Sequence, residues 1–119
     1  MNASEYRHCR PADLLDTVGG DRNTFMLLVD IFKRDTAEKL AWMREALAQG
    51  NRAQLAFNTH AMKGTVGPTG AAQLLQQLVS LEAACRDAQG GYSEQTLDNI
   101  ELQVGQVREE LEQFAANLT

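Results

Sequence analysis

The hydrophobic residues of this chain recur at steps of three and four, and this periodicity constrains the fold more than any other feature. Over residues 21–49 the apolar positions are Phe25, Leu28, Val29, Phe32, Leu40, Met43 and Leu47. Side chains at that spacing share one face of an α-helix. Helical spacing returns later in the chain, and no segment shows the alternation that is typical of a half-buried β-strand. The pattern therefore predicts an all-α protein.

Glycine and proline residues mark where the predicted helices begin and end. Pro11 suits the first turn of a short helix, and Gly50 is a common residue directly after a helix end. Pro68 should end the helix before it, because proline disfavours helical geometry in the preceding residue and lacks an N–H. We expect Thr69 to cap the helix that follows. The predicted helices span residues 11–18, 22–49, 52–66, 70–89 and 93–117.

Four of these helices are long, and the connections between them are short. Short connections make successive helices antiparallel neighbours, so the expected architecture is an up-and-down four-helix bundle with a short extra N-terminal helix. A chain of 119 residues is expected to form one domain over residues 1–119. Ala, Leu, Gln and Glu are abundant, and all four favour helices.

Charge and composition exclude several kinds of partner. The net charge is −5 and no basic cluster is present, which argues against nucleic acid. No stretch approaches the roughly 18 apolar residues of a membrane span. The N-terminus lacks the apolar core of a signal peptide, so we expect a cytoplasmic protein. Cys9 and Cys85 are expected to be free thiols, and no metal site is expected.

His60 is the residue that asks for an explanation, because it falls in the middle of the predicted helix over residues 52–66. At about 100° per residue, Leu55, Met62 and Val66 lie roughly opposite His60 and form the core stripe. His60 is therefore predicted on the solvent face, surrounded by small residues. An ordinary surface histidine and a functional one both remain open at this point.

Gly64 lies one turn after His60 on the same face. Glycine inside a helix costs up to about 1 kcal/mol relative to alanine. Either it leaves clearance around the imidazole or it packs against a neighbouring helix. From Ala46 to Leu81 the chain has no Asp or Glu, although it has sixteen in total. This predicts a neutral to positive face around His60, suited to an anionic adduct or an acidic partner.

The segment THAMKGTVGPTGAAQLLQQLVSLEAACR, residues 59–86, resembles the signature of histidine-containing phosphotransfer (HPt) domains, which act in multistep two-component phosphorelays. The matching positions are His60, Lys63, Gly64, Gly70, Ala71, Leu74, Leu81 and Glu82. The likeness covers the helix layout over about residues 12–117 and the motif over residues 50–86. Two departures are Pro68, where many relatives continue the helix, and Met62 in place of a more usual leucine.

The resemblance implies a phosphocarrier without an ATP site of its own. His60 would accept a phosphoryl group on Nε2 from the aspartyl phosphate of a receiver domain and pass it to the aspartate of another. Lys63 would help to neutralise the group, and Gly64 would leave room for it. The partners would be receiver domains of a hybrid sensor histidine kinase and of a response regulator, which would supply Mg²⁺. The family is mostly monomeric, so we expect a monomer without a cofactor of its own.

The small and apolar residues around His60 suggest a docking patch for the receiver. The predicted patch consists of Ala53, Ala56, Phe57, Ala61 and Gly67. On the helical wheel all five lie near His60 or at the edge of its face. We expect a bulky residue at position 56 to impair transfer without unfolding the protein.

Other functions compete with this interpretation. Sensor kinase dimerisation helices usually place an acid directly after the histidine and a proline five residues on, where this chain has Ala61 and Thr65. No glycine-rich ATP-binding motif is present either. The phosphoacceptor domain of a chemotaxis-type histidine kinase carries a very similar motif and stays open. A helical interaction module that is not phosphorylated is a further alternative, and covalent phosphate uptake would distinguish it.

Overall fold

The computed structural model describes residues 6–87 and 90–118, and within them the chain is helical with no strand. This confirms the all-α prediction. The elements are α1 (Pro11–Thr17), α2 (Arg22–Ala48), α3 (Arg52–Val66), the 3₁₀ turn η2 (Gly67–Thr69), α4 (Ala72–Arg86) and α5 (Glu94–Ala116). None of the helices in this described part is both long and apolar enough to cross a membrane.

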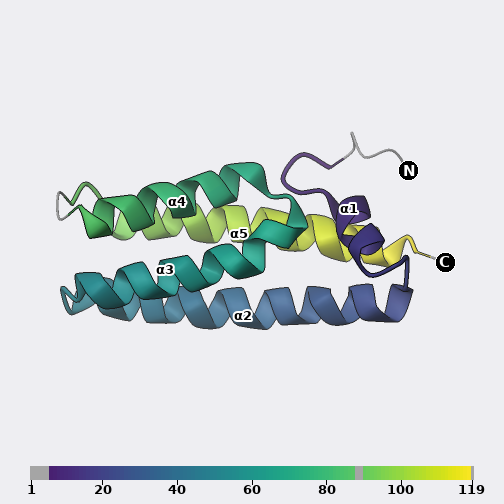
Figure 1. Cartoon of the computed structure of the whole chain (residues 1–119), viewed down its shortest axis with the longest axis horizontal. Coiled ribbons are helices and arrows are strands. Elements are labelled where there is room, and N and C mark those ends of the chain that lie inside the picture. The colour runs from purple at the N-terminus through teal and green to yellow at the C-terminus, as the bar shows by residue number, and fades with distance from the viewer. Residues whose placement is uncertain (1–5, 88–89, 119) are drawn as a thin grey trace.

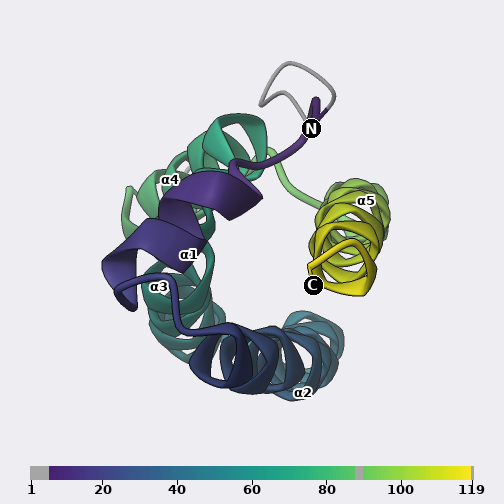
Figure 2. The same cartoon turned by 90° about the vertical axis from the view of Figure 1, so that its right-hand side faces the viewer.

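Helices α2 to α5 run side by side along the long axis of the molecule (Figure 1). Viewed from the end, α2, α3 and α4 follow one another in a curved row, and α5 faces them from the other side (Figure 2). Helix α2 has 27 residues and α5 has 23, whereas α3 and α4 have 15 each. The two long helices therefore extend past the short ones, and α1 lies at that extended end.

The turns explain where the short helices begin and end. Asn51 caps α3 by accepting a hydrogen bond from the Gln54 backbone N–H at 3.1 Å. Helix α3 ends at Val66, as Pro68 predicts. The prediction that Thr69 caps α4 is wrong, because its hydroxyl donates to the Val66 carbonyl inside η2 and is buried.

Helix α4 is shorter than the expected span of residues 70–89. Gly70 takes a left-handed conformation with φ of 72° at the end of η2, so the chain cannot be helical there. Helix α4 begins two residues later, after Ala71, which makes no side-chain cap. It ends at Arg86, and the last two residues of the expected helix, 88 and 89, lie outside the described residues.

The core runs the length of the bundle and is lined by the predicted apolar stripes. Its largest fully buried side chains are Phe25, Met43, Leu55, Met62, Leu74, Leu78, Leu97, Ile100 and Leu111. Cys9 and Cys85 are buried and free, as predicted.

The segment before α1 is held against the C-terminal part of α5. The backbone N–H groups of Arg7, His8 and Cys9 all donate to the carboxylate of Glu110 on α5, at 2.8–3.1 Å. The Tyr6 ring meets the Phe114 ring edge-on, with centroids 5.8 Å apart. These contacts hold the N-terminal segment against α5.

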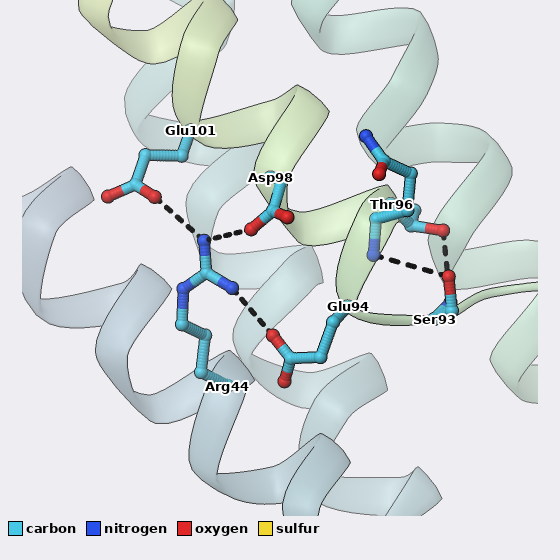
Figure 3. A network of polar contacts seen from close by, with 7 residues as sticks. Arg44, Ser93, Glu94, Thr96, Asp98 and Glu101 are labelled. Atoms are coloured by element: carbon cyan, nitrogen blue, oxygen red, sulfur yellow. Dashed lines mark hydrogen bonds and ion pairs between the residues drawn. The ribbon is translucent and has the colours of Figure 1, made fainter.

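An ion-pair network joins α2 to the beginning of α5 at the opposite end (Figure 3). The Arg44 guanidinium contacts the carboxylates of Glu94, Asp98 and Glu101 at 2.7–2.9 Å. Ser93 starts α5 with a capping box, in which its backbone N–H donates to the Thr96 hydroxyl. Both ends of the bundle are thus fastened by polar contacts.

Candidate functional site

His60 projects from the middle of α3 toward solvent. Its side chain is 64% exposed, whereas Leu55, Met62 and Val66 on the opposite face are fully buried. The orientation agrees with the helical wheel. A histidine on this face is open to a partner molecule.

Glu82 on α4 lies directly beside His60, although the sequence indicated an acid-free face. Its Oε2 is 3.0 Å from His60 Nδ1, and its Oε1 is 2.6 Å from Lys63 Nζ. Glu82 is only 6% exposed. The face is therefore not free of acids, because packing of α4 against α3 brings in the first acid beyond the acid-free stretch, but Lys63 and Arg86 both pair with this one carboxylate, so the charge beside His60 stays neutral to positive.

Arg86 completes the contacts of this carboxylate. Its Nη2 and Nε donate to Glu82 Oε2 at 2.6 Å and 3.1 Å. The hydrogen bond from Lys63 is the main cause that lowers the pKa of Glu82 to about 2, with Arg86 and His60 adding to it against the opposing effect of burial. Glu82 is consequently ionised at neutral pH, and its oxygens can only accept hydrogen bonds.

The contact with Glu82 decides which nitrogen of a neutral His60 ring has a lone pair available for a partner. Because an ionised carboxylate only accepts, His60 Nδ1 must donate, and a neutral ring then carries its lone pair on Nε2. The Nδ1 side faces the buried carboxylate, so Nε2 is the ring nitrogen left for a partner. The site therefore offers one oriented nitrogen nucleophile.

Gly64 leaves open space beside this nucleophile. A Cβ placed on Gly64 would meet no atom within 4 Å, so the glycine does not pack against a neighbouring helix. Of the two explanations for a glycine here, the clearance explanation agrees with the geometry. Lys63, one residue earlier, is partly exposed and can turn toward a group on the histidine.

The predicted docking residues do not all reach the surface. Phe57 is 66% exposed, Ala53 and Gly67 are exposed, and Ala61 is half-buried. Ala56 is buried in the core, which contradicts its expected place on the surface. Helix α3 packs between α2 and α4, so less of its circumference is exposed than the wheel implies. A bulky residue at position 56 would displace packed atoms and would not test docking alone.

Trp42 on α2 is an exposed aromatic residue near the site that the sequence did not single out. It is 45% exposed and lines a surface hollow together with Phe57 and the buried Asn58. The Lys39 ammonium lies 4.9 Å from the centre of its ring. A sequence signal existed, because Trp42 lies outside the apolar stripe of its helix.

The fold and the site together define a class of protein: a helical bundle that presents one oriented histidine on an open helix face. The Hpt domain family model matches residues 27–117, so the chain belongs to the Hpt domain family. It is a phosphocarrier module that acts in histidine phosphotransfer in phosphorelay signalling.

A solved structure has the same fold. The crystal structure of histidine-containing phosphotransfer protein B (HptB) from Pseudomonas aeruginosa PAO1 matches with a TM-score of 0.84. The two chains are 22% identical, and the match covers 94% of this chain and 97% of that chain. A search among curated proteins finds no significant match.

Proposed function

We propose that His60 Nε2 is the atom that carries the phosphoryl group. The lone pair of Nε2 attacks phosphorus in the aspartyl phosphate of a receiver domain, the bond from phosphorus to the aspartyl oxygen breaks, and the carboxylate leaves. The same exchange in reverse, on a second receiver, returns the ring to its neutral form. The observation that carries this proposal is the 3.0 Å contact between His60 Nδ1 and Glu82, which reserves Nε2 for the reaction.

Glu82 also stabilises the product of the transfer. When Nε2 bonds to phosphorus while Nδ1 keeps its proton, the imidazole ring becomes positively charged. The Glu82 carboxylate accepts the Nδ1–H hydrogen bond, so it stabilises that charge at the moment it forms. Lys63 then neutralises part of the phosphoryl charge, and the space at Gly64 admits the group.

The receiver supplies the remaining chemistry in this proposal. Phosphoryl transfer needs in-line positioning and charge stabilisation, and the receiver contributes Mg²⁺ and its own acidic cluster. This chain then needs no ATP site and no cofactor of its own. We place the transfer in the cytoplasm, between receiver domains of a hybrid sensor histidine kinase and a response regulator, with the chain as a monomer.

The surface around His60 fits such a partner. Phe57 and Trp42 provide exposed apolar area, and Ala53, Ala61 and Gly67 add little bulk. Lys63 and Arg86 lie near the histidine and place positive charge opposite the carboxylates of a receiver. Apolar contact would give affinity, and the charges would orient the encounter.

The test measures acid-labile phosphate on this chain. The protein is mixed with Mg²⁺ and a receiver that carries ³²P on its aspartate, and separately with ATP and Mg²⁺. We expect labelling only from the receiver, abolished in His60→Gln and retained in the matched control His8→Gln. Labelling from ATP alone, or labelling that survives His60→Gln, would contradict the proposal.

A further inference from the structure

Arg86 is the member of the site that the proposed transfer leaves without a role. Its guanidinium makes two of the contacts to Glu82 Oε2, yet its side chain is 63% exposed and lies on α4, one turn beyond Glu82. In the unphosphorylated protein Lys63 already pairs with the other oxygen, Oε1, at 2.6 Å. One buried carboxylate therefore has two cations.

The second cation becomes necessary once His60 is phosphorylated. A phosphoryl group carries a charge of about −1.5 to −2 at neutral pH, and its oxygens compete with Glu82 for Lys63. Without Arg86, a Lys63 that moved to the phosphoryl group would leave a buried carboxylate with only the His60 Nδ1–H as its partner. Buried charges that lose a partner are costly, so Lys63 would be held back by Glu82.

The total charge of the side chains around His60 also supports a role for Arg86 after phosphorylation. With Lys63, Arg86 and Glu82 ionised and His60 neutral, the four side chains sum to +1. Because the phosphorylated ring keeps its Nδ1 proton and becomes positively charged, phosphorylation brings this sum to about 0 with Arg86 and to about −1 without it. Arg86 thus keeps the total charge of the site close to zero in the phosphorylated protein as well as in the unphosphorylated one.

We propose that Arg86 is a positioning residue that holds Glu82 in place while Lys63 moves to the phosphoryl group. Arg86 acts through Glu82 and Lys63 and does not touch the phosphoryl group. This inference rests on the proposed phosphorylation of His60, but its test needs no receiver, so the two can fail separately.

The test uses the full chain phosphorylated with phosphoramidate, in which Nε2 displaces ammonia from phosphorus. A ³¹P NMR titration then gives the pKa of the second ionisation of the phosphoryl group. A cation close to the group favours its dianion and lowers this pKa. In Arg86→Gln, Lys63 stays with Glu82, so we expect this pKa to rise by roughly 0.5 unit. Arg86→Lys should restore part of the difference.

Two further variants separate positioning from other effects. Arg52→Gln removes an equal charge from an exposed residue that does not contact Glu82, and we expect no shift. In a Lys63→Gln background there is no lysine to release, so adding Arg86→Gln should change the pKa little. An equal rise with and without Lys63 would show that Arg86 contacts the phosphoryl group directly and would overturn the proposal. An unchanged pKa in Arg86→Gln would overturn it as well.

Discussion

Glu82 is a buried carboxylate whose two oxygens hold three other side chains at once. Lys63 takes Oε1, and Arg86 and His60 share Oε2. The histidine and the lysine come from α3 and the glutamate from α4, so the reactive tautomer depends on how two helices pack. Histidine chemistry on this surface is in this sense a property of the α3–α4 contact.

Acid should remove the contribution of Glu82 to stability. Its pKa in the folded protein is about 2, below the ordinary value of 4.5, so the ionised form favours folding. That contribution is complete above about pH 4.5 and declines as the pH falls toward 2. We expect the difference in free energy of unfolding between wild type and Glu82→Gln, from urea titrations at several pH values, to shrink over this range. A difference that stays constant from pH 6 to 2 would contradict the assignment.

Alanine at position 64 should make the protein more stable and slower in phosphotransfer. An exposed Gly→Ala change inside a helix contributes up to about 1 kcal/mol, and no atom lies within 4 Å of the new Cβ. The same Cβ narrows the space beside His60. Thermal melting and the rate of label transfer from a receiver measure the two effects.

Gly105 on α5 provides the matched control for this change. It is also helical, and the nearest atom to an added Cβ is Arg108 Nη2 at 3.9 Å. Gly105→Ala should therefore raise stability in the same way and leave transfer unchanged. Equal transfer rates in wild type and Gly64→Ala would show that the clearance at position 64 has no function.

At the scale of the elements, the turn between α3 and α4 depends on a close approach between Gly70 and Arg10. Gly70 has a φ of 72°, and a Cβ there would lie 2.8 Å from Arg10 Cβ. The Arg10 backbone N–H also donates to the Thr69 carbonyl at 2.7 Å. The N-terminal segment can pass over this turn only because residue 70 has no side chain.

Alanine at position 70 should destabilise the protein by more than the conformational cost alone. A left-handed conformation costs a non-glycine residue about 1–2 kcal/mol, and the contact with Arg10 adds to it. Gly50→Ala is the control, because Gly50 has a φ of 65° and open space around its Cβ. Urea unfolding should give a larger loss for Gly70→Ala than for Gly50→Ala. Equal losses would show that the contact with Arg10 is without energetic weight.

The helices could be predicted from the sequence because their signals are local. Apolar spacing identified each bundle helix, and Pro68 and Gly50 marked ends within one or two residues. Thr69 does not cap α4, because it is the last residue of the 3₁₀ turn η2 and its hydroxyl donates to the Val66 carbonyl. The role of Glu82 and the burial of Ala56 depend on the register between α3 and α4, which no single-helix pattern contains. One signal was present, because Glu82 lies beside the buried stripe of Leu78, Leu81 and Cys85, where a charge needs a partner.

At the scale of the whole molecule, the N-terminal segment is fastened to α5, whereas the proposed phosphoryl acceptor His60 is on α3. Glu110, near the C-terminal end of α5, accepts hydrogen bonds from the backbone N–H groups of residues 7–9. At this end of the bundle α2 and α5 extend past α3 and α4 (Figure 1). Stability at this end and chemistry at His60 should therefore be separable by mutation.

Replacing Glu110 should loosen the N-terminal segment without affecting phosphotransfer. Glu110→Ala leaves the N–H groups of residues 7–9 without their acceptor, and we expect a loss of about 1–3 kcal/mol. Amide hydrogen exchange at these residues should become faster, and label uptake by His60 should stay normal. The exposed neighbour serves as the control in Glu109→Ala. A drop in uptake by the folded Glu110→Ala protein would show that the two ends are coupled.

The meeting of Tyr6 with Phe114 places the first and last described segments side by side. A linker from residue 118 back to residue 6 could therefore join these two segments in a circular permutation, in which a cut opens a turn elsewhere. A cut between the exposed Gly19 and Gly20 would place α1 at the C-terminal end of the permuted chain and leave α2, α3 and α4 consecutive. His60, Lys63, Glu82 and Arg86 would keep every neighbour they have now. The proposed phosphocarrier site is thus a property of two adjacent helices, α3 and α4, and does not depend on where the polypeptide starts.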